Sequence, residues 1–100
     1  MFFFRKTDIN RAVAECRATP GAVLLDVREA GEFRSGHIPG AVNLPLSVIR
    51  TADWPKETPL FVYCLRGARS RQAVDALRQM GYYAAKSIGG ILSYKGEKEP

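Results

Sequence analysis

The stretch that decides the fold is residues 60–70, which reads Leu60-Phe61-Val62-Tyr63-Cys64-Leu65-Arg66-Gly67-Ala68-Arg69-Ser70. Its first four residues form a short apolar run, which is typical of a strand buried on both faces. Its last residues lead into the most regular helix pattern of the chain, over residues 67–80, which Gly81 closes. The stretch therefore predicts a strand, a tight turn and a helix, with Cys64 at the carboxyl end of the strand.

The rest of the chain alternates between the same two patterns. Helices are predicted from a cap at Thr7-Asp8 to about Ala18 and over residues 29–34, 45–51 and 91–95, and strands over residues 22–27, 41–44 and 82–88. This alternation predicts an α/β fold of three layers, a mainly parallel central sheet with helices on both faces. We expect one domain over residues 1–100, with a core of about 8–95, terminal segments 1–6 and 96–100, and a frayed tail from residue 95 onward.

Composition narrows the classes of partner. The chain has 15 Lys and Arg against 10 Asp and Glu, a net charge of +5 that is scattered along the sequence. Without a basic tract, the pattern argues against nucleic-acid binding. No run approaches the ~18 apolar residues of a membrane span, so no membrane partner is expected. Residues 1–4 are apolar but end at Arg5-Lys6, so no export signal is predicted and the expected compartment is the cytoplasm.

The cysteine count predicts free thiols and no metal site. Cys16 and Cys64 lie 48 positions apart, no Cys-x-x-Cys pair exists, and His37 is the one histidine of the sequence. Cys16 falls on the apolar face of the first predicted helix, which favours a core residue over a resolving thiol. Phe2–Phe4 is interpreted either as an edge strand or as a surface for self-association.

Cys64 stands among groups that stabilise a negative charge on sulfur. Arg66 and Arg69 follow it closely, and a helix begins within the same turn; both features lower the pKa of a cysteine. Gly67 permits the backbone conformation that makes N–H groups converge on an anion. The stretch therefore predicts a nucleophilic cysteine in an anion-binding loop.

The spacing of the arginines separates two kinds of anion. Cysteine-dependent phosphatases place an arginine six positions after the cysteine, where it binds phosphate with two hydrogen bonds. In this chain Ser70 occupies that position, and the neighbouring arginines are Arg69 and Arg71. A loop shorter by one residue encloses a smaller space, which favours a sulfur atom carried on sulfur over a phosphate group.

Motifs along nearly the whole chain resemble those of single-domain rhodaneses. They are LLDVRE at residues 24–29, Glu32-Phe33, GHIPGAVNLP at residues 36–45, YCLRGARS at residues 63–70, Gly81-Tyr82 and IGG at residues 88–90. The resemblance implies a rhodanese-like fold and a sulfurtransferase. In that reaction Cys64 takes sulfane sulfur from thiosulfate or a persulfide donor and passes it to cyanide, a thiol or a protein acceptor. The resemblance implies no cofactor beyond the persulfide on Cys64.

Further residues receive expected roles. The persulfide would rest among the N–H groups of residues 65–70, while Asp26 and Arg28, at another strand end, would support the loop as an opposite wall. Arg69 either binds substrate or, as we favour, pairs with Asp26, because a buried carboxylate needs a partner. Arg28 is expected to pair with a glutamate of residues 29–32 or with the substrate. His37 lies in a stretch that is a structural turn in the rhodanese pattern.

Two alternatives remain open at this stage. The first is a cysteine-dependent phosphatase or arsenate reductase, and the second is a non-catalytic binding module with a rhodanese fold. The presence of Cys64 argues against the binding module, and the loop length argues against the phosphatase. We expect a monomer or a weak homodimer, a small anionic sulfur donor and a thiol or protein acceptor.

Overall fold

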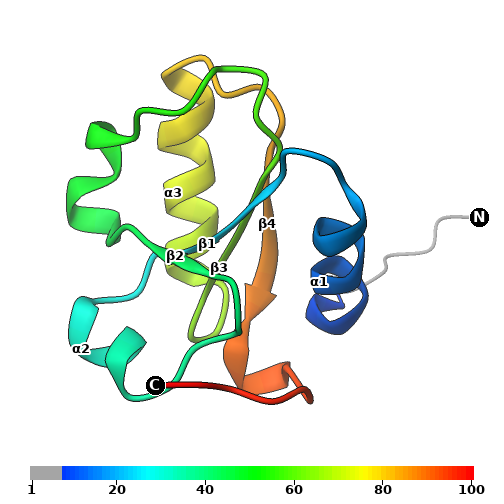
Figure 1. Cartoon of the computed structure of the whole chain (residues 1–100). Coiled ribbons are helices and arrows are strands. Elements are labelled where there is room, and N and C mark those ends of the chain that lie inside the picture. The colour runs from blue at the N-terminus through cyan, green and yellow to red at the C-terminus, as the bar shows by residue number, and fades with distance from the viewer. Residues whose placement is uncertain (1–7) are drawn as a thin grey trace, which may run out of the picture.

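The computed structural model describes residues 8–100, and within them four neighbouring strands form one parallel sheet. The strand order is β2 (Val42–Asn43), β1 (Val23–Asp26), β3 (Leu60–Cys64) and β4 (Ala85–Gly90). Figure 1 shows α1 (Ile9–Ala18) on one side of the sheet and α3 (Ala68–Gln79) with the 3-10 helix η1 (Leu46–Thr51) on the other. The short elements α2 (Ala30–Arg34) and η2 (Ile91–Ser93) complete the described chain. The predicted three-layer α/β architecture is confirmed.

Two apolar clusters fill the spaces between the layers. Leu25 and Val62 pack with the cluster under α3, whereas Leu24 and Phe61 pack with the cluster under α1. This alternation follows from strand geometry, because successive side chains point to opposite faces. Cys64 belongs to the cluster under α3. The parallel register also brings the carboxyl ends of β1 and β3 to the same edge of the sheet.

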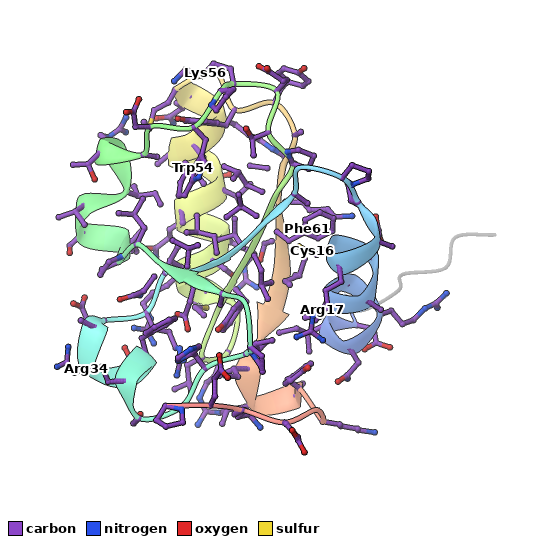
Figure 2. All side chains as sticks on the ribbon, in the orientation of Figure 1. Cys16, Arg17, Arg34, Trp54, Lys56 and Phe61 are labelled. Carbon is purple, nitrogen blue, oxygen red and sulfur yellow. The ribbon has the colours of Figure 1, made fainter. Side chains whose placement is uncertain are left out.

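Helix α1 forms where its cap and apolar spacing predict it. Asp8 is the N-cap, and its Oδ1 accepts a hydrogen bond from the Asn10 N–H at 3.0 Å. Ile9 and Cys16 are among the buried residues that face the sheet. Figure 2 shows Cys16 close to Phe61 of β3, a member of the same apolar cluster. Cys16 is therefore a core residue, and its burial raises the pKa of the thiol.

The predicted strand over residues 82–88 is displaced toward the C-terminus. The observed strand, β4, begins at Ala85, because residues 80–84 form the cap of α3 and the turn that follows it. The Tyr82 N–H donates to the Leu77 carbonyl at 3.0 Å, and the Gly81 N–H donates to the Arg78 carbonyl at 3.0 Å, a hydrogen-bonding pattern that closes a helix. The buried Tyr82 hydroxyl accepts from the Trp54 N–H at 3.0 Å, which fixes it in a turn rather than in the sheet.

The prediction of a frayed tail is wrong. The His37 N–H donates to the Glu99 carbonyl and the Glu99 N–H donates to the His37 carbonyl, both at 2.8 Å. These two hydrogen bonds form an antiparallel bridge between the end of the chain and the loop that precedes β2. The charged residues at the end of the chain gave no sign of this pairing, because it is made by backbone groups that are distant in the sequence.

Two expectations drawn from apolar patterns have separate outcomes. The interpretation of Phe2–Phe4 lies outside the described residues. Within residues 8–100, none of the helices has the length and apolar character needed to cross a membrane.

Candidate active site

Cys64 is the last residue of β3, and its sulfur lies at the N-terminus of α3. Between the two elements, Gly67 adopts a φ of 115°, a left-handed conformation that favours glycine. This turn directs two backbone N–H groups at Sγ: that of Gly67 at 3.0 Å and that of Ser70 at 3.3 Å. Helix N-termini carry partial positive charge and unpaired N–H groups, so the position suits an anionic sulfur.

The environment favours the thiolate of Cys64. Burial of Cys64, whose relative exposure is 1 %, opposes ionisation. Hydrogen bonds from the Ser70 side chain and from the backbone of Ser70, Gly67 and Arg66 outweigh that burial and lower the pKa of Cys64 below its ordinary value. The pKa values of the two cysteines are therefore shifted in opposite directions, because burial without such donors raises the pKa of Cys16.

A small pocket opens at the sulfur. Its volume is about 150 Å³, and it is lined by Cys64, Leu65, Arg66, Ala68 and Arg69. This is below the ~300–1,000 Å³ of typical sites for drug-sized ligands, so the pocket suits a small group. Arg66 is exposed at the pocket. The predicted loop residues from Cys64 to Ser70 are therefore brought together around one sulfur atom.

Arg69 pairs with Glu32, and the predicted pairing with Asp26 is wrong. Its Nη1 and Nη2 donate to the two carboxylate oxygens of Glu32 at 2.6 and 3.0 Å. This contact with Arg69 is the main reason why the pKa of Glu32 is lowered to about 2. The guanidinium contributes positive charge at the pocket, but its two terminal nitrogens are already bound to a carboxylate. The residue ties the Cys64 loop to α2.

Asp26 and Arg28 form their own pair on the other face of the sheet. Arg28 donates from Nη2 to Asp26 Oδ2 at 2.7 Å and from its backbone N–H to Oδ1 at 2.9 Å. The expected partners of Arg28 among residues 29–32 are therefore wrong. Asp26 points to the side of Leu24 and Tyr63, whereas Cys64 points to the side of α3. Neither Asp26 nor Arg28 lines the pocket at the sulfur, so they are not its opposite wall.

The pair instead orders the end of β1. The Asn43 side chain donates to the carbonyls of Asp26 and Arg28 at 3.0 and 2.9 Å, which joins β2 to this corner. Arg28 Nη2 also donates to the Gly36 carbonyl at 2.8 Å. The predicted supporting role of the two residues stays a prediction, and any such support would act through the backbone.

His37 lies apart from the pocket. Its ring stacks on Phe33 with centroids 3.7 Å apart, and Nδ1 lies 2.9 Å from the Phe33 carbonyl oxygen. Its backbone holds the bridge to Glu99. In the part of the chain from Asp8 onward, no group of three or more His, Cys, Asp or Glu side chains is placed to hold a metal ion.

Two residues of β4 that sequence reasoning missed lie against the loop. A Cβ atom built on Gly90 would lie 2.5 Å from Arg66 Cα and 2.7 Å from Arg66 N, so the loop backbone rests directly on this glycine. The Ser87 hydroxyl lies 2.7 Å from the Ser70 hydroxyl. The tandem Gly89-Gly90 at the end of a predicted strand was a usable signal for close backbone approach. For Ser87 the sequence carried no signal.

Comparison with known sequences gives one consistent assignment. Residues 10–97 match the family model described as a rhodanese-like domain. A sulfurtransferase of Allochromatium vinosum is 38% identical over 79 residues, which cover 76% of this chain and 74% of that protein. The thiosulfate sulfurtransferase PspE of Escherichia coli is 35% identical over 71 residues, 67% of this chain and 68% of that protein. In some larger relatives the match is a fraction of the whole, as in the adenylyltransferase and sulfurtransferase uba4 of Ogataea parapolymorpha, of which it covers 25%.

Solved structures agree with this assignment. The human single-domain sulfurtransferase TSTD1 superposes with a TM-score of 0.71 at 30% identity, covering 83% of this chain and 88% of that one. A rhodanese from E. coli, solved with anions, has a TM-score of 0.70 at 32% identity, covering 77% of this chain and 95% of that one. Both the sequence and the arrangement of the elements are therefore similar to those of sulfurtransferases.

Proposed function

Because the chain belongs to the family of rhodanese-like domains, we propose that it is a sulfurtransferase that carries sulfane sulfur as a persulfide on Cys64. One observation carries the proposal: the Cys64 sulfur lies at the N-terminus of α3, receives the N–H groups of Gly67 and Ser70, and opens into a small pocket beside Arg66. Such a site stabilises a thiolate before the reaction and an anionic persulfide after it.

In the first half-reaction, the Cys64 thiolate attacks the outer sulfur of thiosulfate. A sulfur–sulfur bond forms to Cys64, the bond between the two thiosulfate sulfurs breaks, and sulfite leaves with its electron pair. No proton moves if Cys64 is already a thiolate, and the lowered pKa of Cys64 favours that form. Arg66, exposed at the pocket, attracts the dianionic donor.

In the second half-reaction, a nucleophile attacks the outer sulfur of the persulfide. The bond between the two sulfurs breaks, and its electron pair returns to Cys64 as the thiolate. Cyanide serves as the acceptor in an assay, and a thiol or a protein serves in the cell. The cycle uses no cofactor beyond the sulfur carried on Cys64, and its two separated half-reactions follow ping-pong kinetics.

Two observations favour thiosulfate over a phosphate ester as substrate. Among the relatives, PspE is a thiosulfate sulfurtransferase. In addition, a phosphatase needs an arginine free to bind phosphate with two hydrogen bonds. The two terminal nitrogens of Arg69, which lies in the loop one position before Ser70, are bound to Glu32 instead.

The test is a steady-state assay of thiocyanate formation from thiosulfate and cyanide. The wild type should follow ping-pong kinetics, and Cys64→Ser should lose turnover. Cys16→Ser is the matched control, because Cys16 lies in the core under α1 and not in the pocket, so activity should persist.

An aryl phosphate is assayed in parallel with the same three proteins. Hydrolysis that depends on Cys64, without thiocyanate formation, would replace the proposal with a phosphatase. Absence of both activities in a folded wild type, together with no persulfide on Cys64, would make the binding module the better account.

A further inference from the structure

Arg69 and Glu32 form an ion pair at the edge of the Cys64 pocket. Arg69 is one of the five residues that line this pocket, whereas Glu32 belongs to α2, none of whose residues line it. The two terminal nitrogens of Arg69 lie 2.6 and 3.0 Å from the two carboxylate oxygens of Glu32. A contact with two hydrogen bonds uses the same donors that the oxygens of an anionic substrate would take. The Glu32 carboxylate therefore competes with substrate for Arg69.

The charge of Glu32 persists at neutral pH. Its contact with Arg69 lowers its pKa to about 2, so the carboxyl is ionised at pH 7. A carboxylate in contact with a guanidinium offsets the charge of that group, and the pair acts on a distant anion more weakly than a single charge does. Removal of the Glu32 charge alone would leave the full positive charge of Arg69 beside the pocket.

Arg66 is the second arginine of the pocket, and its charge is not offset in this way. Its side chain is exposed, and within residues 8–100 no carboxylate lies in salt-bridge contact with it. Asp26 and Arg28 pair with each other and do not line the pocket. Two arginines therefore line the pocket, but only Arg66 acts there as a single positive charge.

We propose that Glu32 is a positioning residue that sets donor specificity: by offsetting the charge of Arg69, it lowers the preference of the Cys64 pocket for sulfur donors with two negative charges over donors with one. Glu32 does not line the pocket, and it acts through Arg69. The inference deepens the proposed function and rests on it for turnover, whereas the charge of the pocket is measured without any sulfur donor.

Two donors of the same reaction differ by one charge. Thiosulfate carries two negative charges, and methanethiosulfonate carries one, because a methyl group replaces an oxygen. With either donor, the Cys64 thiolate attacks the outer sulfur and a sulfur–sulfur bond forms to Cys64. The bond between the two sulfurs of the donor breaks, and sulfite or methanesulfinate leaves with the electron pair. Both reactions yield the same persulfide, so a change in their relative rates between variants reports the charge of the pocket.

The test compares kcat/KM for the two donors in the wild type and in Glu32→Gln, with cyanide as the acceptor. Glutamine keeps the shape of Glu32 and an oxygen that accepts from Arg69, and it removes the charge. We expect the ratio of thiosulfate to methanethiosulfonate to rise about threefold, because the released charge acts on two negative charges instead of one. The rise should shrink at about 1 M salt, where the Debye length is about 3 Å.

Two further variants separate the charge on Arg69 from other changes in α2. Glu32→Asp keeps a carboxylate beside Arg69 and should leave the ratio near that of the wild type. Glu29→Gln removes the same charge from the N-cap of α2, but Glu29 is exposed and is not the carboxylate that pairs with Arg69. The ratio should therefore change less in Glu29→Gln than in Glu32→Gln.

A second readout needs no sulfur donor. Iodoacetate is an anion and iodoacetamide is uncharged, and both alkylate the thiolate of Cys64, which mass spectrometry separates from Cys16. Because both reagents need the same thiolate, a change in the pKa of Cys64 cancels in the ratio of their rates. The ratio of iodoacetate to iodoacetamide should rise about twofold in Glu32→Gln.

The outcomes separate the inference from the proposed function. An alkylation ratio that is unchanged or lower in a folded Glu32→Gln protein would overturn the inference. So would a donor ratio that is unchanged or lower, or one that rises equally in Glu32→Asp. A raised alkylation ratio in a protein that transfers no sulfur from either donor would overturn the proposed function and support the effect of Glu32 on the charge of the pocket.

Discussion

At the scale of single residues, uncharged donors dominate the environment of the Cys64 sulfur. The N–H groups of Gly67 and Ser70 and the Ser70 hydroxyl outweigh the burial that opposes ionisation. The adjacent Arg69 is bound to Glu32, so part of its positive charge is offset. The lowered pKa of Cys64 therefore depends on the path of the loop backbone, and that path rests on glycine.

Gly90 provides the sharpest test of this dependence. Gly90→Ala would place a methyl group against the Leu65 carbonyl oxygen and the backbone of Arg66. We expect the loop to shift and kcat for thiocyanate formation to fall at least about tenfold, since displacing an oxyanion-hole type donor costs on the order of 10²-fold or more. In the same variant, the midpoint of the pH dependence of Cys64 alkylation by iodoacetamide should move to higher pH.

The matched control is Gly31→Ala. Gly31 lies in α2, and a Cβ there would meet only Arg34 Nη2, at 3.9 Å. Its activity should be unchanged and its stability equal or higher, because alanine is the better helix former. Equal activity in Gly90→Ala and Gly31→Ala would contradict the close support of the loop by β4.

At the scale of elements, the short helix α2 is held to the start of α3 by one side chain. Glu32 accepts from Arg69 across the gap and from the Glu29 N–H at 3.0 Å within its own capping box. The sequence predicted α2 and the reactive turn separately, from local patterns. It did not predict their contact: Asp26 was the expected partner of Arg69, and only the packing shows that Glu32 takes that place.

The pKa of Glu32 gives this contact a pH signature. The carboxyl has a pKa of about 2 in the folded protein against an ordinary 4.5. A folded pKa below the unfolded one means that the stabilisation is fully present above about pH 4.5 and is lost as pH falls toward 2. Because each side chain is about one third exposed, at 32% and 33%, solvent screens the pair and we expect about 1 kcal/mol.

Urea unfolding of Glu32→Gln measures that contribution. The free energy of unfolding should be about 1 kcal/mol below the wild type at pH 7, and this difference should shrink between pH 4.5 and 3. Glu15→Gln is the control, because its pair with Lys86 is more exposed and contributes little. A difference that stays constant from pH 7 to pH 3 would show that the charge of Glu32 is not what joins α2 to the loop.

At the scale of the whole molecule, the Cys64 loop, α2 and the end of the chain all lie at the edge of the sheet where the strands have their carboxyl ends (Figure 1). The parallel sheet and the helix layers were predictable, because short buried strands alternating with amphipathic helices have few ways to pack. The pairing of Asp26 with Arg28 and the bridge between His37 and Glu99 were not. The pairing of Asp26 with Arg28 depends on which face of the sheet the two side chains occupy. The bridge depends on backbone groups that are far apart in the sequence.

The bridge to the tail predicts that residues 97–100 contribute to stability. Their deletion removes two backbone hydrogen bonds between His37 and Glu99 and should cost on the order of 1 kcal/mol. In hydrogen exchange, the His37 amide should be protected in the full chain and exchange freely in the truncated one. Glu99→Ala should retain the protection, because the bridge is made by the backbone. Equal exchange of the His37 amide in the full and truncated chains would contradict the bridge.

Cys64 itself carries the central claim, which intact-mass spectrometry tests most directly. After incubation with thiosulfate and removal of the excess, the wild type and Cys16→Ser should each gain one sulfur, about 32 Da, as a persulfide that cyanide removes. Cys64→Ser should gain nothing. A wild type that stays at its original mass, or a Cys64→Ser protein that gains the same sulfur, would contradict the account.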